Sequence, residues 1–385
     1  MSSRSSIIGS VIIVIVVFSA VTGYIYVSRQ YVPPDIAVVV RAPGFGDLSM
    51  ADQVLQGLNE LSGEMVVNYK YFTATDEQNA QAILETLSAS HIYQLIVVIG
   101  SELSDELQTV AASYSNQKYA LIGGTVSAPN IYSTTFALQE ASFLAGVLAG
   151  VVSASNTNRT SIVGIIGSVE TDPTVMKLVA GFKQGFYYAN NTLDYSITLL
   201  PDRYVGSYND SVTAEQLAKD MWNPTIGNAS VIFAPVRASI MGIRNAMEYA
   251  NKTWFCNTTN REPFVIAAEG DQDWLGLPNI ETRTGSSWIL TSVVPRSDVA
   301  VFRVINATLW GEFEGTTLRY RIDNSTNLPA GTLPIMRSMS DIGVNLTNFE
   351  YSDTDWVPNT TLELIKTIRT EIFYGTITVS ETYGG

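Results

Sequence analysis

A short apolar run that ends in acidic side chains is the part of this sequence best suited to hold a ligand. Residues 264–268 are apolar, and Glu269, Asp271, Gln272 and Asp273 follow them within five positions. The run predicts a buried strand of a parallel sheet. Ligands of open α/β sheets bind beyond the carboxyl ends of the strands, where loops offer hydrogen-bonding groups. We therefore expect Glu269 and Asp271 to contact a ligand.

The composition argues against several other kinds of chemistry. His91 is the only histidine and has no catalytic partner in view, while the single Cys256 allows neither an intrachain disulfide nor a cysteine-based metal cluster. Paired acids alone are weak support for hydrolysis. We predict no enzyme activity, no cofactor and no metal site. The net charge of −14 argues against nucleic acid, because phosphate binding needs clustered Lys and Arg.

The acidic turn needs a sheet to position it, and the sequence contains two series of alternating strands and helices. The first series has predicted strands at residues 36–40, 66–71, 94–99, 119–122 and 131–136, and helices at 50–61, 77–88 and 104–113. A helix at 139–152 follows the first series. The second series has predicted strands at 161–166, 195–200, 230–233, 264–268 and 288–294, and helices at 172–189, 213–221, 239–251 and 297–311. This spacing is typical of doubly wound α/β lobes. We expect two such parallel-sheet lobes to form a clamshell around a ligand.

The amino-terminal segment is the part that could cross a membrane. Residues 7–27 carry no charge and are flanked by Arg4 and Arg29. At ~1.5 Å per residue, a helix of this length spans a bilayer core. A signal peptide is the alternative, although its apolar core usually has only ~7–15 residues. We favour an uncleaved transmembrane anchor, with residues 1–6 as a cytoplasmic tip and residues 28–35 as a linker.

Asn-x-Ser/Thr tripeptides indicate on which side of the membrane the bulk of the chain lies. Many of them, without a central proline, suggest a glycosylated surface in an archaeal or eukaryotic setting. We assign the acceptors to Asn158, Asn191, Asn209, Asn228, Asn251, Asn257, Asn306, Asn324, Asn345 and Asn359. The prediction is a single-pass protein of the cell membrane whose carboxyl-terminal bulk is extracellular.

Several motifs of the sequence point together to one known family. The most specific of them is residues 131–146, which end in Glu140-Ala-Ser-Phe-Leu-Ala-Gly146. This segment resembles the first crossing strand and the following helix of the basic membrane protein family of extracytoplasmic substrate-binding proteins, which includes purine nucleoside receptor lipoproteins. Further resemblances follow in the same order at residues 163–167, 181–185, 205–210, 265–272 and 372–379.

The resemblance implies a type I periplasmic-binding-protein clamshell with three crossings between its lobes. We place lobe 1 at residues 36–136 plus 296–385 and lobe 2 at residues 137–295. The implied function is capture of a small solute, often a nucleoside, for an ABC importer, with the solute and the permease as partners. The alternative is a glycosylated surface structural or adhesion protein that keeps the clamshell without binding a ligand.

The residues that match the family's binding site depart from its pattern. Where the family stacks a purine between aromatics, this chain has Met50 and Tyr208, with Phe45 as a substitute for Met50. The acid after the family's first strand matches Arg41, and the glycine-rich turn matches residues 234–239. The expected ligand-binding set is Arg41, Phe45, Asp47, Met50, Tyr208, Arg237, Glu269 and Asp271.

Two interpretations of the added arginines remain open. If Arg41, Arg237 and Arg296 face the cleft, they favour an anionic or carbonyl-rich ligand through charge-assisted hydrogen bonds. Alternatively, they pair with Glu269, Asp47 and Asp271 as structural salt bridges. We favour the structural pairing.

Overall fold

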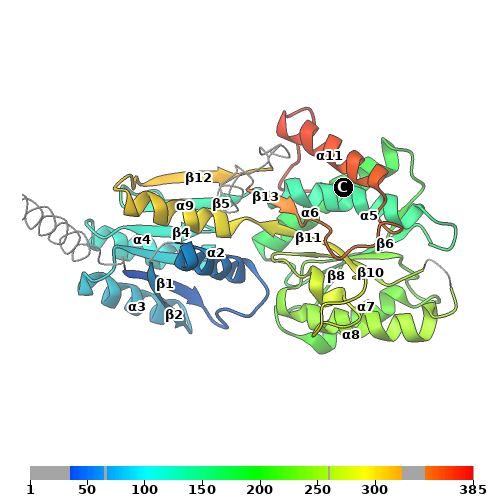
Figure 1. Cartoon of the computed structure of the whole chain (residues 1–385), viewed down its shortest axis with the longest axis horizontal. Coiled ribbons are helices and arrows are strands. Elements are labelled where there is room, and N and C mark those ends of the chain that lie inside the picture. Colours follow the sequence, from blue (N-terminus) through cyan, green and yellow to red (C-terminus); the bar gives the residue numbers. More distant parts are fainter. Residues whose placement is uncertain (1–34, 65–66, 259–260, 323–342, 385) are drawn as a thin grey trace, which may run out of the picture.

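The computed structural model describes residues 35–64, 67–258, 261–322 and 343–384. Figure 1 shows two α/β halves that lie side by side along the long axis of the molecule. The predicted anchor at residues 7–27 and the tip before it lie outside the described residues, as does Asn324. Within the described ranges, no helix combines the length and the hydropathy that a bilayer crossing requires.

The first half contains a parallel sheet with the strand order β12-β5-β4-β3-β1-β2. The strands are β1 (Asp35–Arg41), β2 (Asn68–Ala74), β3 (Leu95–Ile99), β4 (Tyr119–Ile122), β5 (Ile131–Phe136) and β12 (Thr316–Tyr320). Its helices are α2 (Met50–Glu64), α3 (Glu77–Ser90), α4 (Ser104–Ser113) and α9 (Ser297–Leu309). Helices α2 and α9 pack together, as do α3 and α4.

Strand β1 shows why the central strands of this sheet are continuous apolar runs in the sequence. Its residues Ile36, Val38 and Val40 belong to the same apolar cluster as α2 and α9, whereas Ala37 and Val39 belong to the cluster of α3 and α4. Helices therefore cover both faces of the sheet, and all positions of β3 and β4 and the inner five of β1 are buried.

The second half repeats this order as β13-β11-β10-β9-β6-β7, with β8 also paired to β6. The strands are β6 (Ile162–Gly167), β7 (Thr198–Leu199), β8 (Arg203–Tyr204), β9 (Val231–Ala234), β10 (Phe264–Ala268), β11 (Ile289–Pro295) and β13 (Val344–Leu346). Its helices are α5 (Leu138–Ala154), α6 (Pro173–Asn191), α7 (Ser211–Trp222), α8 (Ile240–Ala250) and α11 (Asn359–Phe373). In both sheets the order reverses direction beside the first strand, and ligands of doubly wound sheets bind at such switch points.

Helix α5 is buried along almost its whole length because α6, α11 and the second sheet surround it. Glycines let α5 and α6 approach each other closely. A Cβ atom at Gly146 would lie 2.1 Å from the Phe182 carbonyl oxygen, and one at Gly185 would lie 1.9 Å from the Phe143 carbonyl oxygen. These glycines therefore allow the backbones of the two helices to pack directly against each other.

The tail differs from the expectation that residues 296–385 all join the first lobe. Helix α9 packs on α2 and β12 pairs with β5, but β13 pairs antiparallel with β11, and α11 packs on α5. Buried Val344, Leu346, Ile365, Ile368 and Ile372 attach this part of the tail to the second half. The sheet edge at β11 and the apolar surface of α5 explain the attachment. The division into lobes at residues 136/137 and 295/296 stays a proposal.

Candidate functional site

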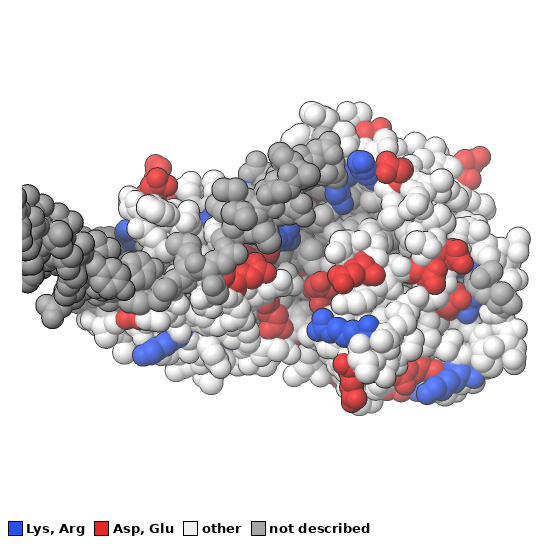
Figure 2. Space-filling model, viewed as in Figure 1, with Lys and Arg blue, Asp and Glu red and all other residues white. Residues whose placement is uncertain are grey.

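Three acidic or basic side chains follow the carboxyl ends of neighbouring strands in the second sheet. Asp172 follows β6, Arg237 follows β9 and Glu269 follows β10. The loop after β10 touches the first half, because the Gln272 Nε2 atom donates a 2.8 Å hydrogen bond to the Leu48 carbonyl oxygen. The strand ends therefore lie at the junction of the two halves, where Figure 2 shows acidic side chains gathered.

Glu269 and Arg237 form an ion pair at this junction. The Arg237 Nε atom donates to Glu269 Oε2 at 2.7 Å, and Glu269 is only 3% exposed. The other carboxylate oxygen, Oε1, is buried and has no hydrogen-bond partner among the residues that the structure describes. A carboxylate oxygen can only accept, so a bound molecule could donate a hydrogen bond to it.

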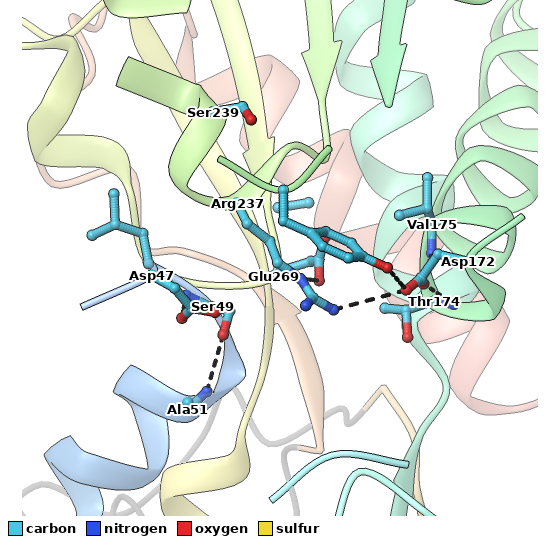
Figure 3. Close-up of polar contacts among 12 residues, drawn as sticks. Asp47, Ser49, Ala51, Asp172, Thr174, Val175, Arg237, Ser239 and Glu269 are labelled. Carbon is cyan, nitrogen blue, oxygen red and sulfur yellow. Dashed lines mark hydrogen bonds and ion pairs between the residues drawn. The ribbon is translucent and has the colours of Figure 1, made fainter. Parts of the chain in front are cut away.

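Tyr208 and Asp172 complete the group on the side of the second half. The Tyr208 hydroxyl donates to Asp172 Oδ2 at 2.6 Å, while Asp172 Oδ1 caps α6 by accepting from the Thr174 and Val175 amides. The Arg237 guanidinium carbon lies 4.3 Å from the centre of the Tyr208 ring, and its Nη2 atom lies 4.0 Å from Asp172 Oδ2. Arg237 thus covers one face of the ring. Figure 3 shows its guanidinium beside Glu269 and joined to Asp172 by a dashed line.

Burial and charge act in opposite directions on this group. Burial raises the pKa of Glu269, and the charge of Arg237 offsets part of that increase. Burial lowers the pKa of Arg237, but Glu269, Asp172 and Asp47 outweigh this effect and leave its pKa above the ordinary value. Arg237 is therefore charged at every physiological pH. Burial and the hydrogen bond to Asp172 raise the pKa of Tyr208, which stays protonated.

Asp47 is an expected site residue of the first half, and it lies near the group formed by Arg237, Glu269, Tyr208 and Asp172. It lies in the loop between β1 and α2, and Figure 3 shows it across from Arg237. Burial raises its pKa, while the Ser49 hydrogen bond and the charge of Arg237 lower it. Asp47 of the first half and Arg237 of the second half therefore influence each other through their charges.

Three other expected site residues make contacts within the first half. Arg41 pairs with Glu77 at 2.7 Å. Phe45 packs edge-on against Tyr71, with ring centres 5.2 Å apart. The Met50 side chain lies against Gly123, where a Cβ atom would come within 2.3 Å of its terminal methyl group. None of these contacts joins them to Glu269, and their role in ligand binding stays a prediction.

The structural pairing expected for the arginines occurs at one of the three. Arg237 pairs with Glu269 as expected, whereas Arg41 pairs with Glu77, and Arg296 pairs with Asp298 at 2.8 Å. Glu77 at the start of α3 and Asp298, two residues after Arg296, pair with these arginines instead of the acids of the cleft.

Asp271 and Asp273 shape the turn after β10. Asp271 is exposed, and its Oδ1 atom accepts from the Asp273 amide at 3.2 Å. Asp273 is buried and accepts hydrogen bonds from the hydroxyls of Ser292 and Thr347, which tie the turn to β11 and to the tail. Burial, aided by the charge of Asp271, raises the pKa of Asp273 to about 7.

Asp172 is the site residue that the sequence analysis did not select. It is the residue before Pro173 and follows a predicted strand by a few positions. An Asp-Pro step marks the start of a helix, and the position after a strand end marks the binding edge of the sheet. Together these two signals could have identified it. Among the described residues, no group of His, Cys, Asp and Glu side chains is placed to hold a metal ion.

The predicted glycosylation sites differ in exposure. One assignment was misplaced: in Asn190-Asn191-Thr192 the acceptor is Asn190, because Thr192 lies two residues after it. The exposed acceptors include Asn158, Asn209, Asn257 and Asn359. Asn345, by contrast, lies in β13, and its side-chain oxygen accepts from Arg369.

Two doubly wound sheets, parallel apart from β13, with polar strand ends at their junction define a two-lobed ligand-binding protein of the α/β class. A family model described as an ABC transporter substrate-binding protein, PnrA-like (Bmp), matches residues 34–325. The chain belongs to this family, which confirms the resemblance seen in the sequence. The family consists of substrate-binding proteins of ABC transporters and not of enzymes.

Individual relatives are distant in sequence. An uncharacterized lipoprotein of Pyrococcus abyssi is 25% identical over 73% of this chain, and the match spans 65% of that protein. The ABC transporter nucleoside-binding protein BmpA of Lactococcus lactis is 23% identical over 75% of this chain and 79% of its own length. The chain thus spans about two thirds of the length of the Pyrococcus relative.

Solved structures support the fold. A solute-binding protein of an ABC transporter system from Aeropyrum pernix K1 matches 91% of this chain and 94% of its own, with a TM-score of 0.70 at 22% identity. A second such protein, from Conexibacter woesei, matches 91% of this chain and 100% of its own, with a TM-score of 0.66 at 14% identity. At these identities the likeness establishes the architecture alone.

Proposed function

We propose that this chain is a membrane-anchored, extracytoplasmic solute-binding protein that captures a nucleoside or another small polar solute for an ABC importer. Family membership supports the solute and the permease as partners. The name of the Lactococcus relative supports a nucleoside, and the lipoprotein name of the Pyrococcus relative supports attachment to a membrane. In this chain we assign that attachment to residues 7–27, because no cysteine follows that segment closely enough to carry a lipid.

The observation that carries the proposal is the free oxygen of Glu269. A buried acceptor without a partner is unfavourable by about 1–3 kcal/mol, and a hydroxyl of a bound solute would satisfy it. The oxygen lies beyond the carboxyl end of β10 at the junction of the halves, which is where ligands of this fold class bind. We assign Glu269, Tyr208, Arg237 and Asp47 to the binding site on this basis.

Isothermal titration of the full-length chain in detergent tests the proposal. The ligands are adenosine, guanosine, inosine, cytidine and uridine, and at least one of them should give saturable heat. Glu269→Ala should abolish that heat, whereas Glu248→Ala, at a partly exposed position of α8, should leave it unchanged. Absence of heat with every nucleoside would remove the nucleoside version and leave other polar solutes.

The alternative, a glycosylated surface protein without a ligand, draws support from Asn209. This exposed acceptor is the neighbour of Tyr208, and its side-chain oxygen accepts from Ser207. A glycan there would crowd the junction. Glycopeptide mass spectrometry distinguishes the two functions: an occupied Asn209 favours the surface protein, and an unmodified Asn209 beside occupied Asn158, Asn257 and Asn359 favours solute binding.

A further inference from the structure

Arg237 makes two contacts that a nucleoside-like solute would need for itself. A flat base needs an aromatic face, and the guanidinium of Arg237 covers a face of Tyr208 at 4.3 Å. A pair of neighbouring hydroxyls needs both oxygens of a carboxylate, and Arg237 Nε occupies Oε2 of Glu269 at 2.7 Å. Oε1 is the one oxygen of this carboxylate that stays free for a ligand.

The surroundings of Arg237 suit a flat cation. Its guanidinium contacts Glu269, and its Nη2 atom lies 4.0 Å from Asp172 Oδ2. The negative charge of Asp47, from the first half, also favours its charged form. One positive group thus lies against two carboxyl groups and an aromatic ring, with the negative charge of Asp47 acting on it from the first half, and such surroundings bind guanidinium-like ions in proteins. The excess of acidic groups disfavours an anion, so the expectation of an anionic ligand does not fit this group.

We propose that Tyr208, Glu269, Asp172 and Asp47 form a binding site for a flat group with N–H donors, that Arg237 occupies this site as an internal competitor, and that a solute binds by displacing its guanidinium. The inference rests on the proposed function in one respect, since the solute enters the same site. It adds a ligand class: a neutral or positively charged flat group, and not a phosphate or carboxylate.

Displacement has a quantitative consequence for affinity. Suppose that a solute binds only to molecules in which Arg237 has moved away. Its apparent Kd then equals its intrinsic Kd divided by the fraction of such molecules. If that fraction is about 1%, removing Arg237 improves the apparent affinity about 100-fold. Arg237 is therefore a specificity-determining residue, because only solutes that outcompete a stacked guanidinium are retained.

The test compares two ligands on the wild-type chain and on two variants. Arg237→Gly removes the side chain, and glycine suits the backbone there because φ is 49°. Arg237→Gln removes the charge and serves if the glycine variant does not fold. Arg319→Gln, in an exposed ion pair with Glu381, is the matched control. Circular dichroism melting establishes folding, and isothermal titration measures binding of methylguanidinium and of the nucleoside panel to the full-length chains.

We expect methylguanidinium to bind the Arg237 variants at least tenfold more tightly than the wild type or Arg319→Gln. We expect a nucleoside that binds the wild type to bind these variants at least tenfold more tightly too. Folded Arg237 variants that gain no affinity for methylguanidinium would overturn the proposal. So would a variant that loses nucleoside binding, because Arg237 would then be a direct ligand contact.

The two proposals can fail separately. If methylguanidinium binds the Arg237 variants while no nucleoside binds any chain, the internal competitor stands and the nucleoside function fails. If a nucleoside binds the wild type and the variants equally, and methylguanidinium binds neither, the nucleoside function stands and the internal competitor fails.

Discussion

Arg237 and Glu269 lie in a backbone conformation that residues other than glycine rarely adopt, with φ values of 49° and 75°. Such positions persist only where the surroundings hold them, and they concentrate at functional sites. Here the side chains hold each other through a buried ion pair, and the Glu269 amide donates to the Val293 carbonyl oxygen. Local backbone strain and the proposed binding site therefore coincide in the same two residues.

Replacing Glu269 tests how much the ion pair stabilises the fold. Glu269→Gln keeps the shape but removes the charge that Arg237 pairs with, and the unfolding free energy should fall by about 1–3 kcal/mol. Asp172 limits the loss because it lies 4.0 Å from the same guanidinium. Urea denaturation measures the change. Glu248→Gln, in a partly exposed pair, should change it by less than about 0.5 kcal/mol. A midpoint like that of the wild type would contradict the prediction.

Asp273 should make stability depend on pH. Its folded pKa is about 7, whereas an unfolded aspartate has a pKa of about 3.9. The folded chain thus keeps a proton that the unfolded chain releases, so the stabilisation is fully present below about pH 4 and is lost as the pH rises through about 7. The loss is on the order of 4 kcal/mol.

Asp273→Asn cannot titrate and should flatten this part of the pH profile of the melting temperature, measured by calorimetry between about pH 4 and about pH 8. Asp355→Asn, at an exposed position, should keep the wild-type slope. An Asp273→Asn profile that still falls as steeply as the wild type would show that other groups cause the dependence.

At the scale of elements, the sequence predicted those strands that are buried on both faces. The predicted bounds of β4, β5 and β10 agree with the structure, because each is a compact run between turn residues. Strand β7 is only two residues long, and β8 and β12 were not predicted as strands. These elements are short or polar, and they exist because a neighbouring strand offers a free edge.

The same limit applies to the candidate site. Strand ends can be read from hydrophobic patterns, so Glu269 was predicted at the binding edge. The stacking of Arg237 on Tyr208 joins two loops about thirty positions apart, and it depends on side-chain conformations that no local pattern encodes. For Arg41 and Arg296, nearer acids competed successfully for the positive charge.

The contact between α5 and α6 provides a prediction for an element pair. In Gly185→Ala the new methyl group would lie 1.9 Å from the Phe143 carbonyl oxygen, so the helices must move apart. We expect the unfolding free energy to fall by about 1–3 kcal/mol, measured by urea denaturation. Met176→Ala removes an exposed side chain from the same helix and should change it by less than about 0.5 kcal/mol. Equal stability of both variants would contradict the close contact.

At the scale of the whole molecule, the loop after β10 is where the two halves touch beside the candidate site. The Gln272 side chain donates to the Leu48 carbonyl oxygen, and Gly270 lies against the same carbonyl group. This contact brings Asp47 toward Arg237, so the approach of the halves and the composition of the site are linked. A change that separates the loops should therefore alter both the shape of the molecule and its affinity.

Gly270→Ala is the substitution that tests this link. Its Cβ atom would lie 2.5 Å from the Leu48 carbonyl oxygen, a backbone atom that can move only if the loops separate. We expect a larger radius of gyration in small-angle X-ray scattering and weaker solute binding in titration. Glu281→Ala changes an exposed side chain in the loop that follows and should affect neither quantity. If Gly270→Ala kept the wild-type radius and affinity, the loop contact would not control the approach of the two halves, and Asp47 would reach Arg237 by some other constraint.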